Sequence, residues 1–203
     1  MSYNGYKYHQ GPGPLPNRWL DCPRKSISMI ADKFLAFKTP LDDSFNDQVP
    51  EHCRFTPAMV FSSMKSHKVR IGLWIDLTNT DRFYNSSEVE NAYDDEKKVK
   101  YFKLKCRGHG ETPDNQQTRL FVNLCDNFIR QHPLEIIGVH CTHGFNRTGF
   151  LLVAYMVEIM DCGVEAAIRV FAEARPPGIY KEDYLRELFK RYGDEGDAPI
   201  VPP

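Results

Sequence analysis

The sequence predicts an α/β layered fold, because apolar runs of strand length alternate with segments of helical spacing and the last third is helical. Hydrophobic residues make up 41% of the 203 residues and charged residues 26%, the composition of a globular protein with a substantial core. The length fits one domain, or one domain with tails.

Three segments have the pattern of β-strands. Residues 69–77 (VRIGLWIDL) are mostly apolar, as in a strand buried on both faces. Residues 102–107 (FKLKCR) alternate apolar and basic side chains. We interpret this basic stripe as the solvated face of an edge strand, with guidance of a phosphate chain as the alternative. Residues 135–141 (EIIGVHC) form the third run and lead directly into the motif described below.

Helical segments are predicted between and after these strands. Thr56 and Thr112 each precede a proline, which predicts an N-cap followed by proline in the first turn. Ser87 and Glu90 have the spacing of a capping box. Three later segments have apolar residues at helical spacing, namely residues 148–160, 164–175 and 181–192.

The two ends of the chain differ from its centre. Residues 1–17 are rich in Gly, Pro, Tyr and Asn without apolar periodicity, so we expect a flexible N-terminal tail. Residues 194–203 are expected to form a linker-like C-terminal tail, typical of a domain cut from a longer protein. One domain over residues 18–193 remains between them.

Charge, hydropathy and cysteine spacing exclude several classes of protein. The net charge of -1 means that affinity for a polyanion requires a local basic patch. No run has the length of a membrane-spanning helix, and the N-terminus lacks the apolar core of a signal peptide, so we expect no membrane partner. The six cysteines contain no CxxC pair and are expected to be reduced, which indicates the cytosol or nucleus.

The segment HCTHGFNRTG, residues 140–149, carries the candidate chemistry. A strand is predicted to end at His140 and a helix to begin near Arg147, and the free N–H groups of a helix N-terminus bind anions. Gly144 permits the tight turn that such a loop needs. Cys141 in this positive field is expected to be a thiolate. Arg147 can hold two phosphoryl oxygens in its planar fork.

The rest of the loop is expected to bind phosphate through its amides, from Thr142 through His143, Gly144, Phe145 and Asn146 to Arg147. The hydroxyl of Thr148 can stabilise the thiolate as a leaving group. These parts make a covalent phosphoryl-transfer site that needs no metal or other cofactor.

Two other interpretations of the motif are weaker. A structural cysteine beside a helix cap does not require an arginine six residues later, flanked by His140 and Thr148. A zinc site formed by His140, Cys141 and His143 is disfavoured because the three lie too close together and no second ligand pair has zinc spacing.

The segment HCTHGFNRTGF resembles the signature loop of the cysteine-dependent phosphatase superfamily, and more narrowly that of the RNA 5′-triphosphatase domain of metazoan mRNA capping enzymes. Residues 17–23 (NRWLDCP), 74–84 (WIDLTNTDRFY) and 174–194 (ARPPGIYKEDYLRELFKRYGD) support the narrower resemblance. The resemblance implies a cysteine-phosphatase-like fold, in which a central, mostly parallel twisted sheet is flanked by helices and a strand–phosphate loop–helix unit forms the active site.

The resemblance also implies a function. Cys141 would attack the γ-phosphorus of a nascent RNA 5′-triphosphate, as a phosphoric anhydride hydrolase in the first step of mRNA capping. It implies a nuclear location near transcribing RNA polymerase II, and a guanylyltransferase domain in the full-length protein. This chain has no K-x-D-G lysine motif for that second activity.

One departure from the superfamily pattern bears on the substrate. Its protein phosphatases use a general-acid Asp on a loop before the cysteine, but residues 106–113 read CRGHGETP and offer only His109 and Glu111. A diphosphate leaving group is less basic than an alkoxide and needs little protonation. The missing Asp therefore favours an RNA triphosphate over a phosphoprotein. The alternatives are a dual-specificity protein phosphatase, a stand-alone RNA 5′-phosphatase or a non-catalytic binder of phosphate ends, the last disfavoured by the Cys–Arg pair.

Further charged residues are candidates for the site. For Asp76, at a strand end, we expect a direct or positioning catalytic role, including that of auxiliary acid; capping of the following turn is the alternative. Arg175 and Lys181 lie in ARPPGIYK and are expected to contact the substrate, although Arg175 also fits a helix-end cation. Arg82, beside two aromatic residues, is a weaker candidate to contact the triphosphate or the first base. The candidates outside the loop, as contacts or supports, are His140, Arg82, His109, Arg175 and Lys181.

Glu88 and Glu90 form an E-x-E pattern associated with metal-dependent RNA triphosphatases. Those enzymes carry paired acidic motifs on several strands, whereas this single copy lies at a predicted helix start. We interpret the pattern as helix capping, and we expect no metal site.

Overall fold

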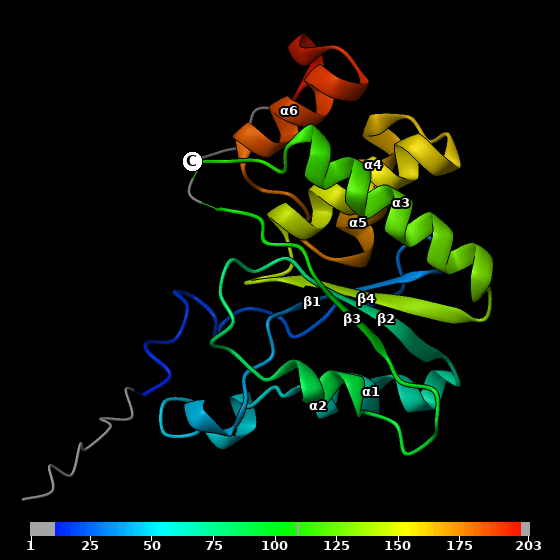
Figure 1. Ribbon diagram of the computed structural model, residues 1–203. Coiled ribbons are helices and arrows are strands. Elements are labelled where there is room, and N and C mark those ends of the chain that lie inside the picture. Colours follow the sequence, from blue (N-terminus) through cyan, green and yellow to red (C-terminus); the bar gives the residue numbers. More distant parts are fainter. Residues whose placement is uncertain (1–10, 109, 200–203) are drawn as a thin grey trace, which may run out of the picture.

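The computed structural model describes residues 11–108 and 110–199. Its strands are β1 (Phe34–Lys38), β2 (Arg70–Asp76), β3 (Lys100–Lys103) and β4 (Glu135–Cys141). Its α-helices are α1 (Pro57–Met64), α2 (Ser86–Glu90), α3 (Asn115–Gln131), α4 (Asn146–Met160), α5 (Val164–Ala174) and α6 (Glu182–Tyr192). Helices α3 to α6 cover one face of the sheet, and α1 and α2 cover the other (Figure 1). This arrangement confirms the predicted α/β fold.

All strand pairs in the sheet are parallel, in the order β1-β4-β2-β3. Their carboxyl ends therefore meet at one edge, where Asp76 lies opposite His140 and Lys38 opposite Cys141. In open parallel sheets this edge is where ligands bind. Strand β1 was not expected from the sequence, and it supplies the neighbour against which the end of β4 is fixed.

Two apolar cores hold the layers together, one on each face of the sheet. Helix α4 is the centre of the larger core, since its side chains from Phe150 to Met156 are all buried. The helix that follows the candidate loop is therefore held on every side. This packing gives the loop a rigid support.

Strand β3 differs from its prediction. It spans Lys100–Lys103, and the expected alternation over residues 102–107 continues beyond the sheet. Lys103 is not part of a solvated stripe, because its ammonium donates to the buried Asp76 carboxylate at 2.8 Å. A buried carboxylate requires a counter-charge, which draws the lysine inward. Lys105 does remain exposed and pairs with Asp81.

The helix limits agree with the sequence to within a few residues, but two caps do not. Thr56 caps α1 as predicted. Thr112 does not cap α3, which begins later behind Asp114, with Gln117 completing a capping box. A carboxylate at that position satisfies the free N–H groups of the first turn, so the helix starts there.

Helix α2 is also capped differently from the prediction. Asn85 is its N-cap, and the capping box joins Asn85 to Glu88 rather than Ser87 to Glu90. The interpretation of the E-x-E pattern as capping is thus confirmed for Glu88, whose carboxylate accepts the Asn85 N–H.

The expected tails fall partly outside the described residues, which exclude 1–10 and 200–203. Within the described part, the Pro12 carbonyl accepts a hydrogen bond from Arg82 and the Gly13 carbonyl one from Gln48. The domain limits stay a prediction. No helix in the described part of the chain is long and apolar enough to span a membrane.

Candidate active site

The loop between β4 and α4 lies at the carboxyl edge of the sheet. Gly144 turns it with a φ of +74° and passes so close to β1 that a side chain there would overlap the Phe37 carbonyl. The Thr142 carbonyl accepts the Thr39 N–H at 3.0 Å, which ties the loop to the residue after β1. The loop is therefore held from the side as well as at both ends.

Replacing Gly144 by alanine is expected to distort the loop, because only glycine fits both its φ and its contact with β1. The left-handed backbone alone costs about 1–2 kcal/mol for other residues. We expect a lower Tm and a loss of turnover of about 100-fold, since small displacements of reacting groups have effects of that size. Thermal unfolding and steady-state kinetics measure both.

The control for this change is Gly163→Ala. The α5 N-cap Gly163 has a φ of -64°, and open space surrounds the position where a Cβ would lie. This variant is expected to retain wild-type turnover. Equal activity in the Gly144 and Gly163 variants would show that the turn at Gly144 tolerates a side chain.

Cys141 lies at the floor of the loop with 3% of its surface exposed. Burial raises the pKa of its thiol, but the Arg147 guanidinium, the Thr148 hydroxyl and amide and the Gly144 amide together bring it below the ordinary value. The Gly144 N–H donates to the sulfur at 3.2 Å. The buried Thr148 hydroxyl has no other partner in the described part of the chain. This surrounding favours the thiolate, the nucleophilic form of cysteine.

Arg147 is held in place by hydrogen bonds to both walls of the site. Its Nη1 donates to the carbonyls of Cys106 at 3.0 Å and Leu77 at 3.4 Å, and its Nη2 donates to the Thr142 hydroxyl at 2.8 Å. Its charge lowers the pKa of Cys141. These contacts and the effect of its charge on Cys141 place the guanidinium in a fixed orientation near the sulfur.

His140 is fully buried and joins the nucleophile to a polar network behind the sheet edge. Its Nδ1 lies 3.1 Å from the Cys141 carbonyl, and its Nε2 lies 2.6 Å from the Tyr84 hydroxyl. Burial lowers the pKa of His140, while the Asp76 carboxylate raises it. Since a carbonyl oxygen only accepts, His140 donates from Nδ1 to the Cys141 carbonyl. The expected supporting role of His140 is consistent with these contacts.

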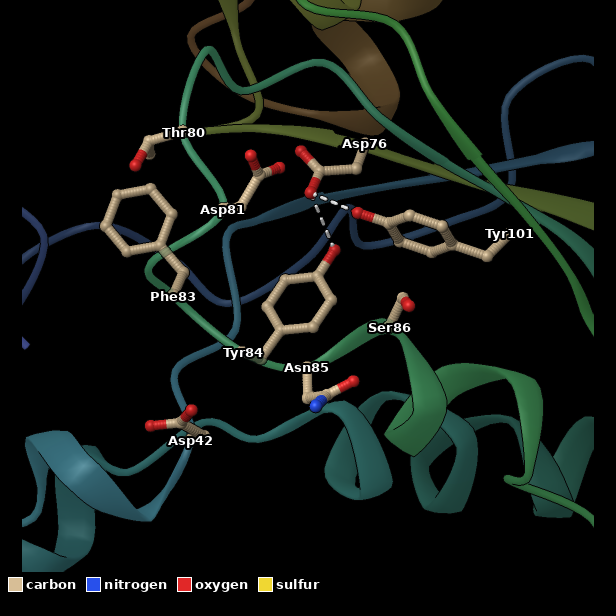
Figure 2. A pocket seen from close by; sticks show the side chains of 9 residues that line it. All are labelled: Asp42, Asp76, Thr80, Asp81, Phe83, Tyr84, Asn85, Ser86 and Tyr101. Atoms are coloured by element: carbon tan, nitrogen blue, oxygen red, sulfur yellow. Dashed lines mark hydrogen bonds between the residues drawn. The ribbon is translucent and has the colours of Figure 1, made fainter.

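Asp76 is the centre of that network. Figure 2 shows Tyr84 and Tyr101 pointing their hydroxyls at its carboxylate, which they approach at 3.1 and 2.8 Å. Burial raises the pKa of Asp76, but His140, Lys103 and the hydrogen bonds from Lys103 and Thr78 bring it down to about 2. The carboxylate therefore stays ionised at neutral pH.

The expectation that Asp76 acts directly on the substrate is corrected by this placement. Asp76 does not line the cleft that contains Cys141, and a carboxyl with a pKa of about 2 holds no proton to donate. It also caps the following turn, by accepting from the Thr78 N–H and hydroxyl. These contacts favour a positioning role for Asp76 through His140 over a direct one.

Arg175 lies beneath the loop rather than in the cleft, which corrects its expected contact with substrate. Its guanidinium is 1% exposed and donates to the carbonyls of His143 at 2.9 Å, Gly144 at 3.3 Å and Pro23 at 2.8 Å. It also lies 4.5 Å from the ring centre of Phe145. Since its donors serve backbone carbonyls, Arg175 fixes the shape of the loop.

The segment before β1 forms a second support that the sequence did not identify. Lys38 is buried and donates to the carbonyls of Trp19 at 2.8 Å and Cys22 at 2.9 Å. Burial lowers the pKa of this ammonium to about 8. The Asn17 carbonyl lies 2.6 Å from His143 Nε2, so this segment forms a wall beside the loop. The NRWLDCP pattern marked this segment in the sequence, but the pattern did not indicate that the segment supports the loop.

A cleft of about 380 Å³ opens above Cys141. It brings together three of the predicted cations, Arg82, Arg147 and Lys181, and none of its described lining residues is acidic. Thr142 and His143 also line it, as predicted for loop residues. The cleft is therefore a cationic pocket with the Cys141 sulfur at its base.

Asn146 and Phe145 are in the loop but their side chains face other partners. The Asn146 side-chain oxygen accepts the N–H groups of Tyr180 and Lys181, each at 3.0 Å. Phe145 is covered by Arg175. Phe145 does not line the cleft and can contribute to phosphate binding only through its backbone. Asn146 does line the cleft, and it also fixes the segment that carries Lys181.

The loop expected to hold an acid offers no carboxylate to the cleft. Glu111 is exposed and lines a neighbouring hollow with Lys105 and Arg107, while its carbonyl accepts the Tyr184 hydroxyl at 2.9 Å. His109 lies outside the described residues. Among the residues described, the cleft has cations, hydroxyls and the thiolate.

A thiolate and an arginine six residues apart, on a phosphate-sized loop between a parallel strand and a helix, define a cysteine-dependent phosphatase. The chain matches the dual specificity phosphatase catalytic domain over residues 55–193, and it belongs to that family. The resemblance stated from the sequence is thereby confirmed at the level of the superfamily.

Comparison with curated proteins confirms the narrower resemblance, which is to mRNA-capping enzymes. The chain is 55% identical to an mRNA-capping enzyme of Danio rerio over 93% of its own length and 45% identical to one of Caenorhabditis elegans over 96%. It spans only 30% and 31% of those proteins. It is 35% identical to an RNA/RNP complex-1-interacting phosphatase homolog of Caenorhabditis elegans, of which it covers 82%.

Solved structures show the same fold. The active form of Tk-PTP matches with a TM-score of 0.63 over 85% of this chain and 97% of the other, at 13% identity. PTPMT1 bound to PI(5)P matches with a TM-score of 0.59 over 83% and 96%, at 17% identity. At these identities the likeness concerns the fold alone.

Proposed function

We propose that this chain is a polynucleotide 5′-triphosphatase, which removes the γ-phosphate of nascent RNA 5′-triphosphate ends and leaves a 5′-diphosphate. The cationic cleft above Cys141 is the observation that carries the proposal. Several phosphates in a row require several cations, and Arg82 and Lys181 supply charge beyond that of Arg147. The 55% and 45% identities with mRNA-capping enzymes support the same activity, as the first step of capping.

In the first chemical step the Cys141 thiolate attacks the γ-phosphorus, forming the S–P bond as the bond from γ-phosphorus to the β–γ bridging oxygen breaks. That oxygen leaves with the electron pair on the RNA diphosphate. Arg147 and the loop amides bind the three transferring oxygens and stabilise charge that shifts among them. The diphosphate is a weakly basic leaving group, which accounts for a cleft without a described carboxylic acid.

In the second step water attacks the phosphorus of the cysteinyl phosphate. The S–P bond breaks, its electrons return to the Cys141 sulfur, and the proton lost by water passes to phosphate or solvent. The Thr148 hydroxyl and Gly144 N–H stabilise the departing thiolate. The same groups therefore favour the sulfur as nucleophile and as leaving group.

The setting of this activity is part of the same proposal, and the identities with mRNA-capping enzymes support it. The chain acts in the nucleus, near transcribing RNA polymerase II, on ends that a guanylyltransferase domain of the full-length protein then caps. The 30% coverage of a capping enzyme supports the presence of such a further domain in that relative.

The proposed activity is tested by substrate comparison. Phosphate release is measured from γ-labelled triphosphate RNA and from a phosphotyrosine peptide at matched concentrations, with and without EDTA. We expect kcat/KM for the RNA to be higher by about 100-fold or more, because only that substrate places phosphates on both Arg82 and Lys181. The chelator is expected to have no effect.

Two results would contradict the proposal. Preference for the phosphopeptide would assign the chain to protein dephosphorylation. Loss of turnover in EDTA would indicate metal-dependent chemistry. RNA bearing a 5′-diphosphate or a 5′-monophosphate is assayed in the same way. Comparable phosphate release from these ends would make the chain a general RNA 5′-phosphatase.

A further inference from the structure

A second hollow of about 420 Å³ adjoins the catalytic cleft and has no part in the steps above. Phe145, Pro176, Pro177 and Tyr180 give it apolar walls, and Arg18 lies at its rim. His143 and Tyr180 line both this hollow and the cleft above Cys141. The two spaces are therefore neighbours on either side of His143 and Tyr180.

Tyr180 is the aromatic ring in these two spaces that a ligand can reach. Its side chain is 39% exposed, whereas Phe83, Phe145 and Tyr184 are exposed by 5%, 6% and 1%. The guanidinium of Arg82 also lies 4.5 Å from the Phe83 ring centre and covers it. Arg82 was expected to contact the triphosphate or the first base. The Phe83 ring beside it is buried and covered, so a base cannot stack there.

The position of Tyr180 is fixed relative to the nucleophile. Its N–H bonds to the side-chain oxygen of Asn146, the first residue of α4, at 3.0 Å. Its ring meets that of Phe145 edge-on, with 5.8 Å between the ring centres. Both partners belong to the catalytic loop or its helix, so the exposed ring and the sulfur move together.

The charged groups around Tyr180 suit the RNA chain that follows a 5′-triphosphate. Burial raises the pKa of its hydroxyl, a hydrogen bond with Asn146 lowers it, and the charges of Cys141 and Arg18 shift it in opposite directions. The hydroxyl is thus within the electrostatic range of both the catalytic sulfur and Arg18. Arg18 is exposed and makes no ion pair among the described residues, although Asp21 also lines the hollow.

We propose that this hollow binds the first nucleoside of the RNA, with its base stacked on Tyr180 and Arg18 placed for the next phosphodiester. The inference rests on the proposed triphosphatase activity and extends it to the nucleoside. A stacking platform accepts any base, because every base has a π-face. Recognition of this kind suits transcripts that differ in their first nucleotide.

The test compares two substrates that share a triphosphate and differ in the nucleoside. Steady-state kinetics are measured for triphosphate-ended RNA and for inorganic tripolyphosphate. With Tyr180→Ala we expect KM for the RNA to rise about tenfold with kcat little changed, since stacking contributes to binding. KM for tripolyphosphate is expected to stay at the wild-type value, which also shows that the variant is folded.

Two variants serve as controls. Tyr180→Phe keeps the flat ring and is expected to retain the wild-type KM for RNA. Leu134 is 89% exposed just before β4, at the opposite edge of the sheet. Leu134→Ala is expected to leave KM unchanged for both substrates.

The outcomes separate the two proposals. Equal changes in KM for RNA and tripolyphosphate, or no change for either, would overturn the nucleoside site and leave the triphosphatase activity intact. Failure of the wild-type chain to release phosphate from RNA would overturn the activity itself, and the nucleoside site with it. A tenfold effect confined to RNA supports both.

Discussion

Cys141→Ser is expected to reduce phosphate release from triphosphate-ended RNA by about 10⁴-fold or more, because removal of a nucleophile costs most of the catalytic effect. The surroundings of Cys141 stabilise a thiolate, and a serine hydroxyl is not ionised at neutral pH. Acid quenching of a single turnover on γ-labelled RNA measures both released phosphate and labelled protein. The wild-type chain should carry transient label that is absent from the variant.

Cys162→Ser is the matched control, because Cys162 follows α4 and is half-buried outside the cleft. It is expected to retain full turnover and labelling. The rate of alkylation by iodoacetate against pH gives a second measurement, in which Cys141 should titrate below an ordinary thiol. Turnover that survives in Cys141→Ser, or titration like a free thiol, would contradict the covalent mechanism.

Arg147→Lys is expected to lower kcat by about 10³-fold although the positive charge is kept, since an arginine that stabilises the transferring phosphoryl group has effects of this order. The guanidinium spans from the Cys106 carbonyl to the Thr142 hydroxyl, and a lysine ammonium cannot bridge both while holding two phosphoryl oxygens. Steady-state kinetics on triphosphate RNA measure the loss. The alkylation pKa of Cys141 should rise if the ammonium lies farther from the sulfur.

Arg186→Lys provides the comparison, since Arg186 is exposed on α6 and pairs with Glu182 away from the cleft. That change is expected to leave kcat and KM unaltered. If Arg147→Lys were equally silent, charge alone would suffice at this position, and the planar fork would have no special part in the reaction.

The sequence was most informative where function depends on consecutive residues. Strand β4 was predicted with its observed limits, and Cys141, Arg147 and the loop between them could be assigned from one short motif. The anion-binding loop is built from backbone amides of adjacent residues, so its chemistry is local. Strand β1 was missed because four apolar residues and a lysine between irregular segments carry no distinct period.

Roles that depend on distant partners could not be predicted in the same way. The charge of Arg175 indicated a substrate contact, but its carbonyl partner Pro23 is 152 positions away in the chain. The tyrosine partners of Asp76 lie on other segments, and so does Lys103, whose charge and hydrogen bond help to lower the pKa of Asp76. A residue type and its neighbours do not show whether a cation will face an anion or a backbone carbonyl.

The supports of the catalytic loop include residues that lie ahead of the family match. The family match starts at residue 55, yet β1 and the turn around Trp19 lie ahead of it and brace the loop through Phe37 and Lys38. A fragment cut to the matched boundaries would contain the nucleophile and its arginine without their scaffold. We therefore expect the minimal active fragment to extend ahead of residue 55 and to include β1 and the turn around Trp19.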